Sequence, residues 1–170
     1  MIKGKRIYLR AVEERDLALL LQWTNDPDIA AQIIGWTFPT SLAQQREWFA
    51  GSLRDQRTQR FVIESYEHGV IGLTGLWDID WHNRMAMTGV KLGATNIRGQ
   101  GYGTDAILTL MNYAFYNVGL NRLWATILSF NVASYQAYVE KCGWQVEGVA
   151  RQEVYRNGKF HDVIRVAALA

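Results

Sequence analysis

The sequence predicts a mixed α/β domain in which helices cover a central sheet of β-strands. Segments with strand-like alternation and segments with helical periodicity follow one another along the chain, roughly in the order β-α-α-β-β-β-α-β-α-β-β. No low-complexity linker or internal repeat interrupts this order, and 170 residues suit one domain of ordinary size. We therefore expect a single domain over residues 1–170, with helices on both sides of a mixed sheet.

The first half of the chain predicts one strand, two helices and then three strands. Asn25-Asp26-Pro27 should stop the first helix, and Ser41 with Gln44 three residues later forms a capping box that should open the second. The expected elements are a strand over 6–12, helices over 17–24 and 41–53, and strands over 61–65, 70–80 and 85–92.

The second half contains the strongest helical pattern, in which apolar residues over 104–118 fall on one face. A strand is expected over 122–128, followed by a helix that Asn131 caps and Gly143 ends. Asn157-Gly158 divides two alternating segments and suits the positive φ angles of a type I′ hairpin turn.

Composition and charge exclude several classes of protein. The net charge is +2, from 18 Lys and Arg against 16 Asp and Glu, and no basic stripe predicts a nucleic-acid partner. No apolar run approaches a bilayer span, and the N-terminus lacks the apolar segment of a secretory signal, so we expect a cytoplasmic protein. The single Cys142 and the three scattered histidines form no metal-binding pattern, and no metal is expected.

The most informative stretch is the glycine-rich segment Arg98-Gly99-Gln100-Gly101-Tyr102-Gly103-Thr104, between a strand and the long helix. Glycines let the backbone approach a ligand closely, and a helix N-terminus offers free N–H groups and a positive dipole end. Arg98 adds a charge that can meet phosphate oxygens. The segment therefore predicts a phosphate-binding loop.

Two other phosphate-binding motifs fit less well. A Walker loop ends in Gly-Lys-Ser/Thr, and no Lys follows Gly103. A dinucleotide fingerprint is matched only loosely, because the next strand ends without an acid and no βαβαβ repeat surrounds the loop.

Arg98-x-x-Gly101-x-Gly103 resembles the coenzyme A signature of the GNAT acetyltransferases. Residues 131–144, with Asn131, Ser134 and Tyr138 in place, resemble the second motif of that superfamily. The tail over 148–162 is similar to the branch with ribosomal-protein alanine and spermidine acetyltransferases. The resemblance implies a GNAT-like fold and transfer of an acetyl group from acetyl-coenzyme A to an amine.

The resemblance also implies residues that bind acetyl-coenzyme A. Backbone N–H groups of the loop would hold the pyrophosphate, and the strand with Val90 and Leu92 would offer its backbone to the pantetheine arm. The expected cofactor-binding residues are Val90, Leu92, Arg98, Gly99, Gln100, Gly101, Tyr102, Gly103, Thr104, Asn131, Ser134 and Tyr138.

Tyr138 is the expected general acid, because a phenol can protonate or stabilise the thiolate that leaves. The alternative is a core aromatic on an apolar helix face. Where relatives often carry a glutamate base, this chain has Met87. Asp80 is the remaining candidate catalytic carboxylate, with Asp78 beside it; His161 or a water chain are the alternatives.

The acceptor pocket is expected between an aromatic loop and the end of a strand. Its expected residues are Trp36, Phe38, Trp77, Asp78 and Asp80, since acids attract an ammonium group and aromatic faces tolerate it. Regular alternation would separate Trp77 from the two acids unless the strand bulges. We expect a small-molecule amine as acceptor; a protein N-terminus or lysine, and a non-catalytic coenzyme A sensor, are the alternatives. The seven Trp and the resemblance also favour a homodimer.

Overall fold

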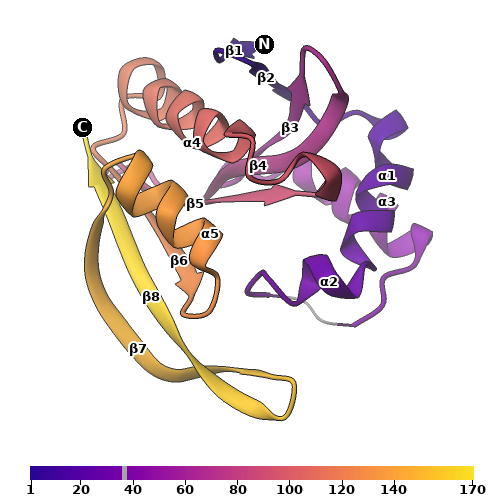
Figure 1. The fold of residues 1–170 in the computed structure, drawn as a ribbon. Coiled ribbons are helices and arrows are strands. Elements are labelled where there is room, and N and C mark those ends of the chain that lie inside the picture. Colours follow the sequence, from indigo (N-terminus) through magenta and orange to yellow (C-terminus); the bar gives the residue numbers. More distant parts are fainter. Residues whose placement is uncertain (36–37) are drawn as a thin grey trace.

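The computed structural model describes residues 1–35 and 38–170, and these form an eight-stranded sheet with helices on both faces (Figure 1). The strand order is β1-β2-β3-β4-β5-β6-β8-β7. The strands are β1 (Ile2–Lys3), β2 (Ile7–Ala11), β3 (Gln59–Ser65), β4 (Gly69–Asp80), β5 (Met85–Leu92), β6 (Arg122–Leu128), β7 (Gln145–Arg156) and β8 (Lys159–Leu169). β5 and β6 are parallel, and the other neighbouring strands are antiparallel.

Helices pack on both faces of this sheet. They are α1 (Leu17–Thr24), α2 (Pro27–Ala30), α3 (Leu42–Ser52), α4 (Tyr102–Asn112) and α5 (Val132–Tyr135), with short 3-10 turns at Glu14–Asp16 and Thr95–Ile97. π-helical turns extend α4 over Tyr113–Val118 and α5 over Gln136–Lys141. None of the helices in the described ranges is long and apolar enough to cross a membrane.

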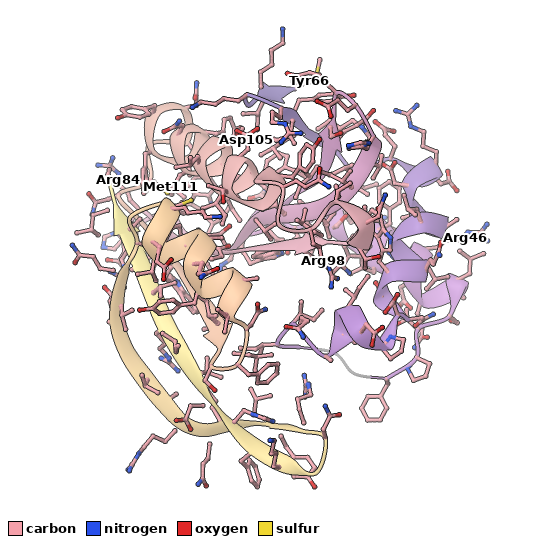
Figure 2. All side chains as sticks on the ribbon, viewed as in Figure 1. Arg46, Tyr66, Arg84, Arg98, Asp105 and Met111 are labelled. Carbon is pink, nitrogen blue, oxygen red and sulfur yellow. The ribbon has the colours of Figure 1, made fainter. Side chains whose placement is uncertain are left out.

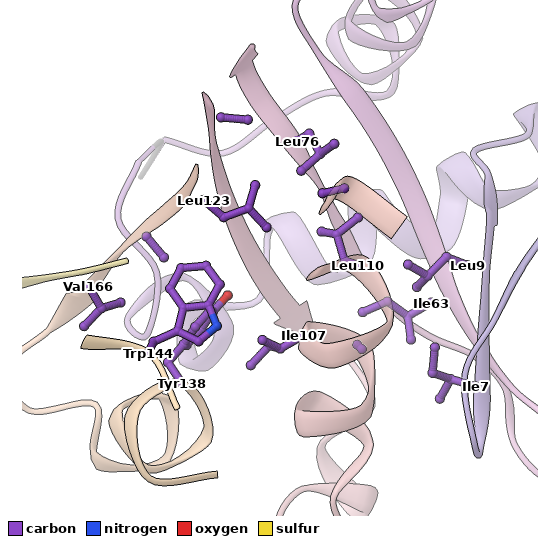
Figure 3. Close-up of a cluster of buried hydrophobic side chains, with 14 of the residues drawn as sticks. Ile7, Leu9, Ile63, Leu76, Ile107, Leu110, Leu123, Tyr138, Trp144 and Val166 are labelled. Atoms are coloured by element: carbon purple, nitrogen blue, oxygen red, sulfur yellow. The ribbon is translucent and has the colours of Figure 1, made fainter. Parts of the chain in front are cut away.

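Two apolar clusters fix the layers. The larger joins α4 and the π-helical turn after α5 to the strands, and Figure 3 shows part of it, including Leu76, Ile107 and Leu110. The smaller joins α1 and α2 to β4, through Leu20, Ile29 and neighbouring side chains. Alternate residues of β4 and β5 therefore face different helical layers.

The structure confirms the mixed sheet and most of the expected elements. Ser41 and Gln44 form the capping box at the start of α3. Asn157 and Gly158 have φ angles of 51° and 80°, as the type I′ turn requires. The residues that stop α1 also begin the short helix α2. Pro27 is its first residue, and Asp26 caps it by accepting hydrogen bonds from the N–H groups of residues 28 and 29.

β5 and β6 diverge soon after they pair. Three residue pairs connect them, from Met85↔Arg122 to Met87↔Trp124. Beyond these pairs β5 runs on to Leu92 and β6 to Leu128, where β6 still pairs with β8. The sheet thus opens along the second half of β5, between the two helical layers.

Candidate active site

A cavity of about 570 Å³ occupies the opening between β5 and β6. Its walls come from β4, β5, β6, the loop before α4, α5 with its π-helical extension, and the segment from α2 to Ile34. We call it the central cavity. It is large enough for an extended ligand, within the range of small-molecule sites in proteins.

The charged walls of the central cavity are cationic. Lys91, Arg98 and Lys141 line it, and none of the described lining residues is Asp or Glu. Arg98 projects from the loop before α4 (Figure 2). Such a cavity suits an anionic ligand such as a phosphate-bearing cofactor.

The glycine-rich loop forms one end of the central cavity. Arg98, Gly99, Gly101, Gly103 and Thr104 all line it. Gly99 and Gly101 have φ angles of 78° and 90°, a left-handed conformation that other residues adopt at a cost. Gly101 is the N-cap of α4, so the free N–H groups of the first helical turn follow directly after it.

The side chains of Gln100 and Tyr102 do not line the cavity. Tyr102 is 1% exposed; its hydroxyl accepts a hydrogen bond from Arg6 at 2.6 Å and donates one to Glu67 at 3.1 Å. Arg6 also donates to the Gln100 carbonyl oxygen at 2.8 Å. These two residues therefore fix the loop to β2, and their backbone N–H groups are what remain for a ligand.

Asn131 connects the cofactor side of the cavity to the segment that follows α2. Its side-chain oxygen accepts a hydrogen bond from the Ser134 N–H at 3.1 Å, and its amide nitrogen donates to the Gln32 carbonyl at 3.0 Å. Asn131, Ser134, Val90 and Leu92 all line the cavity. Asn131 thus caps α5 and also holds the segment that follows α2 through the Gln32 carbonyl.

Tyr138 lines the cavity although its side chain is almost wholly buried. It is 4% exposed, and its hydroxyl has no hydrogen-bond partner among the residues that the structure describes. Burial, and next the neighbouring Cys142 thiol, raise the pKa of Tyr138 above its usual value. The phenol is therefore protonated at neutral pH and free to donate a hydrogen bond to a ligand.

The cavity wall around Trp77 is largely apolar, and the sequence predicted only some of its residues. A Cβ added to Gly75 or Gly89 would come within 3.3 Å of the Trp77 ring, so the indole lies across both glycines. Met87 and Lys91 lie on the same face of β5 as Gly89. Four residues that were not predicted from the sequence also line the cavity: Gln32, Ile33, Ile34 and Lys91. The sequence signal that could have indicated Lys91 is its alternation with Met87 along β5.

The expected acids of the acceptor pocket require correction. β4 bulges after Trp77, and Asp78 has a φ of 49°, but the bulge does not bring Asp78 or Asp80 to the cavity. Asp80 instead accepts hydrogen bonds from the backbone N–H and side-chain amide of Asn83, at 2.8 and 2.7 Å, which lower its pKa. Asp80 thus ends β4, and its carboxylate is engaged by Asn83 outside the cavity.

The other expected residues of this wall lie elsewhere. Phe38 is 66% exposed and is not part of the cavity lining, and Trp36 lies outside the described residues. His161 packs edge-on against Phe130, with ring centroids 4.7 Å apart, and does not line the cavity. Burial raises the pKa of Cys142 to about 11, which makes it a poor nucleophile.

Sequence and structure comparisons identify the relatives of this chain. Residues 6–145 match the model of the acetyltransferase (GNAT) domain. The chain is 26% identical to the spermidine N(1)-acetyltransferase of Vibrio cholerae, over 98% of this chain and 94% of that protein. It is 32% identical to YdaF of Bacillus subtilis, a putative ribosomal N-acetyltransferase, over 98% of this chain and 92% of that protein.

Solved structures agree with this relationship. The crystal structure of the V. cholerae spermidine N-acetyltransferase in complex with CoA and spermine superposes with a TM-score of 0.90 at 26% identity, over 96% of this chain and 95% of that chain. A dodecameric structure of that enzyme superposes with a TM-score of 0.82, over 96% and 94%. The chain belongs to the GNAT acetyltransferase family and is an acetyl-coenzyme A-dependent N-acetyltransferase.

Proposed function

We propose that this chain moves an acetyl group directly from acetyl-coenzyme A to the primary amine of a small molecule, with Tyr138 as general acid. One observation carries the proposal: the buried, protonated hydroxyl of Tyr138, which has no partner in the described part of the chain, lines a cavity whose charged residues there are all cationic. A hydroxyl left unpaired in this way costs free energy unless a ligand accepts its hydrogen bond.

The residues of the central cavity fit acetyl-coenzyme A. The first-turn N–H groups of α4 and the Arg98 guanidinium would hold the phosphates. The free edge of β5, at Val90 and Leu92, would bind the pantetheine arm as an added strand does. When bound, acetyl-coenzyme A supplies an activated thioester.

The chain then has two proton movements to support. Tyr138 would donate its proton towards the departing sulfur, a contribution of roughly a hundredfold to the rate. Among the described lining residues, Asp, Glu and His do not occur. We therefore propose that the acceptor amine loses its proton to water. In this chain the apolar Met87 occupies the position where relatives often carry the glutamate base.

The segment over residues 32–34, which bounds the central cavity, favours a small acceptor. Gln32, Ile33 and Ile34 form part of its wall, and this segment is held from two sides. Asn131 binds the Gln32 carbonyl, and the Arg156 guanidinium donates to the Ile33 carbonyl at 3.4 Å. An acceptor in the cavity must fit beneath this segment, which suits a small molecule better than an extended peptide.

The test is an assay of acetyl-coenzyme A-dependent thiol release, over a panel of small primary amines and of peptides with free N-termini. Acetylation of small amines, lost in Tyr138→Phe, supports the proposal. Faster acetylation of peptides would establish the protein-modifying alternative that the similarity to YdaF raises. Tight coenzyme A binding without acetylation of any amine would instead indicate a sensor.

We also propose that the chain self-associates through the β7–β8 hairpin. Val149, Tyr155 and Phe160 on these strands are each more than half exposed. The seven Trp do not form this surface, because none lies in the sequence of β7 or β8, and Trp23 and Trp144 are core residues. Light scattering should show a mass above that of one chain, and Tyr155→Asp should lower it; a monomer at high micromolar concentration contradicts the proposal.

A further inference from the structure

We propose that the acceptor carries an anionic group several bonds from its amine, and that Lys91 binds that group. This inference rests on the proposed function and specifies the class of small molecule that the central cavity accepts. A polyamine, the substrate in the names of several relatives, is then a poor acceptor for this chain.

Lys91 lines the central cavity from the face of β5 that is turned towards α1 and α2. It lies opposite Leu73 of β4, and both side chains face the layer of α1 and α2. Arg98 and Lys141 come from the other layer, at the loop before α4 and at the end of the π-helical turn after α5. Arg98 and Lys141 can therefore bind the anionic groups of the cofactor. Lys91 instead shares its face of the sheet with Trp77 and Met87.

Among the described residues, the ammonium group of Lys91 has no carboxylate partner. It takes part in none of their ion pairs, and it donates a hydrogen bond to the Thr24 hydroxyl at 3.3 Å. Thr24 ends α1, so the helix dipole supplies partial negative charge there. Burial lowers the pKa of Lys91, as expected for a partly desolvated ammonium group.

A cavity with this charge pattern discriminates between acceptors. An anion near Lys91 would compensate a buried cation and receive charge-assisted hydrogen bonds. A second ammonium group would lie near Lys91 with no Asp or Glu among the described lining residues to offset the repulsion. Like-charge contacts of this kind are a strong source of selectivity.

The spacing along β5 sets the length of the acceptor. Tyr138 and Thr88 line the same narrow recess, so we place the reacting end of the cavity at the edge of β5 beside Thr88 and Gly89. The α carbon of Lys91 lies two residues beyond that of Gly89, about 7 Å along an extended strand. A chain of about five methylene groups between the amine and the carboxylate spans that distance, so 6-aminohexanoate is a suitable probe.

The experiment compares three acceptors that share one skeleton and differ in terminal charge: 6-aminohexanoate, hexylamine and hexane-1,6-diamine. For the wild-type enzyme we expect kcat/KM to fall in that order, with roughly tenfold or more between the anion and the diamine. Lys91→Met should remove the difference, and Lys91→Glu should reverse it. Lys3→Met, which removes a cation from the exposed strand β1, should keep the wild-type order.

Three results would overturn the inference. They are a wild-type preference for the diamine or spermidine, an unchanged order in Lys91→Met, and a Lys91→Met variant that loses acetyl-coenzyme A affinity instead of acceptor selectivity. Circular dichroism confirms that each variant folds, and Lys91→Gln replaces Lys91→Glu if the latter does not. If no amine is acetylated, the proposed function fails, and calorimetric titration of the three compounds into the coenzyme A complex still measures the charge preference.

Discussion

The ring of Tyr138 meets the indole of Trp144 edge to face, with centroids 4.9 Å apart and planes at 80° (Figure 3). The Trp144 N–H in turn donates a hydrogen bond to the Met111 sulfur at 2.8 Å. Packing therefore fixes the phenol ring without using its hydroxyl group. This separation of roles makes it possible to remove the hydroxyl while keeping the ring in place.

Tyr138→Phe should lower turnover about a hundredfold and leave acetyl-coenzyme A affinity nearly unchanged, because only the hydroxyl is lost. Stopped-flow acetyl transfer under conditions in which chemistry limits the rate measures the effect. Tyr135→Phe, one helical turn earlier and outside the cavity lining, is the matched control. Equal turnover in the wild-type and Tyr138→Phe enzymes would make Tyr138 a core residue only.

Gly101→Val should abolish acetyl-coenzyme A binding, because a β-branched residue at a φ of 90° distorts the loop that presents the N–H groups of α4. Backbone strain alone could also destabilise the fold. Gly69→Val, at a φ of 67° at the start of β4, controls for that effect. Calorimetry should find cofactor binding lost only in the first variant; retained binding there would remove the loop from the cofactor site.

Asn131→Ala should raise the acceptor KM, because it releases the segment that Asn131 holds through the Gln32 carbonyl. It should also destabilise the fold by about 1 kcal/mol through loss of the α5 cap. Ser41→Ala removes the cap of α3 and should share only the second effect. If both variants have the same acceptor KM, Asn131 serves the helix alone.

Asp16→Asn should destabilise the fold by about 3 kcal/mol at pH 7, because Asp16 and Arg10 form a largely buried ion pair at 2.8 Å. Burial alone would raise the pKa of Asp16, but hydrogen bonds from Arg10 and the Glu13 N–H together lower it. Stability from a lowered carboxyl pKa is present above the unfolded pKa and is lost as pH falls through the folded one.

Urea unfolding at pH 7 and at pH 3 should therefore show the difference between wild type and Asp16→Asn shrinking in acid. Glu47→Gln, at an exposed carboxylate of α3 that takes part in none of the ion pairs of the described residues, should change stability little at either pH. A pH-independent difference would mean that the substitution acts through packing instead of charge.

The sequence predicted most of the elements, and it singled out residues that line one end of the central cavity, since both depend on local patterns. The glycine spacing, the Ser41 capping box and the Asn157-Gly158 turn depend on backbone conformations that a few adjacent residues determine. The acceptor end could not be predicted in this way. The bulge at Asp78 and the contact between Asp80 and Asn83 depend on how β4 turns into β5.

Lys91 shows the same limit of prediction from sequence, here for a cavity residue that was not predicted. Its position in an alternating strand indicates which face it occupies, but not that α1 and α2 bury it beside a cavity. Similarly, Arg156 reaches the Ile33 carbonyl from a hairpin more than a hundred residues later in the chain. Such contacts arise from tertiary packing, which single-sequence periodicity does not encode.

The divergence of β5 from β6 also links the stability of the sheet to its ligand. Past Met87, the edge of β5 that faces β6 has backbone groups without a partner on that strand. In the absence of cofactor, the amide hydrogens on this edge should exchange with solvent faster than those bonded to β4. A pantetheine arm lying along the edge would protect them, and a ligand at a hundred times its Kd stabilises the fold by about 2.7 kcal/mol. In the proposed binding mode, the cofactor would act as a removable strand whose departure leaves this edge of the sheet unpaired.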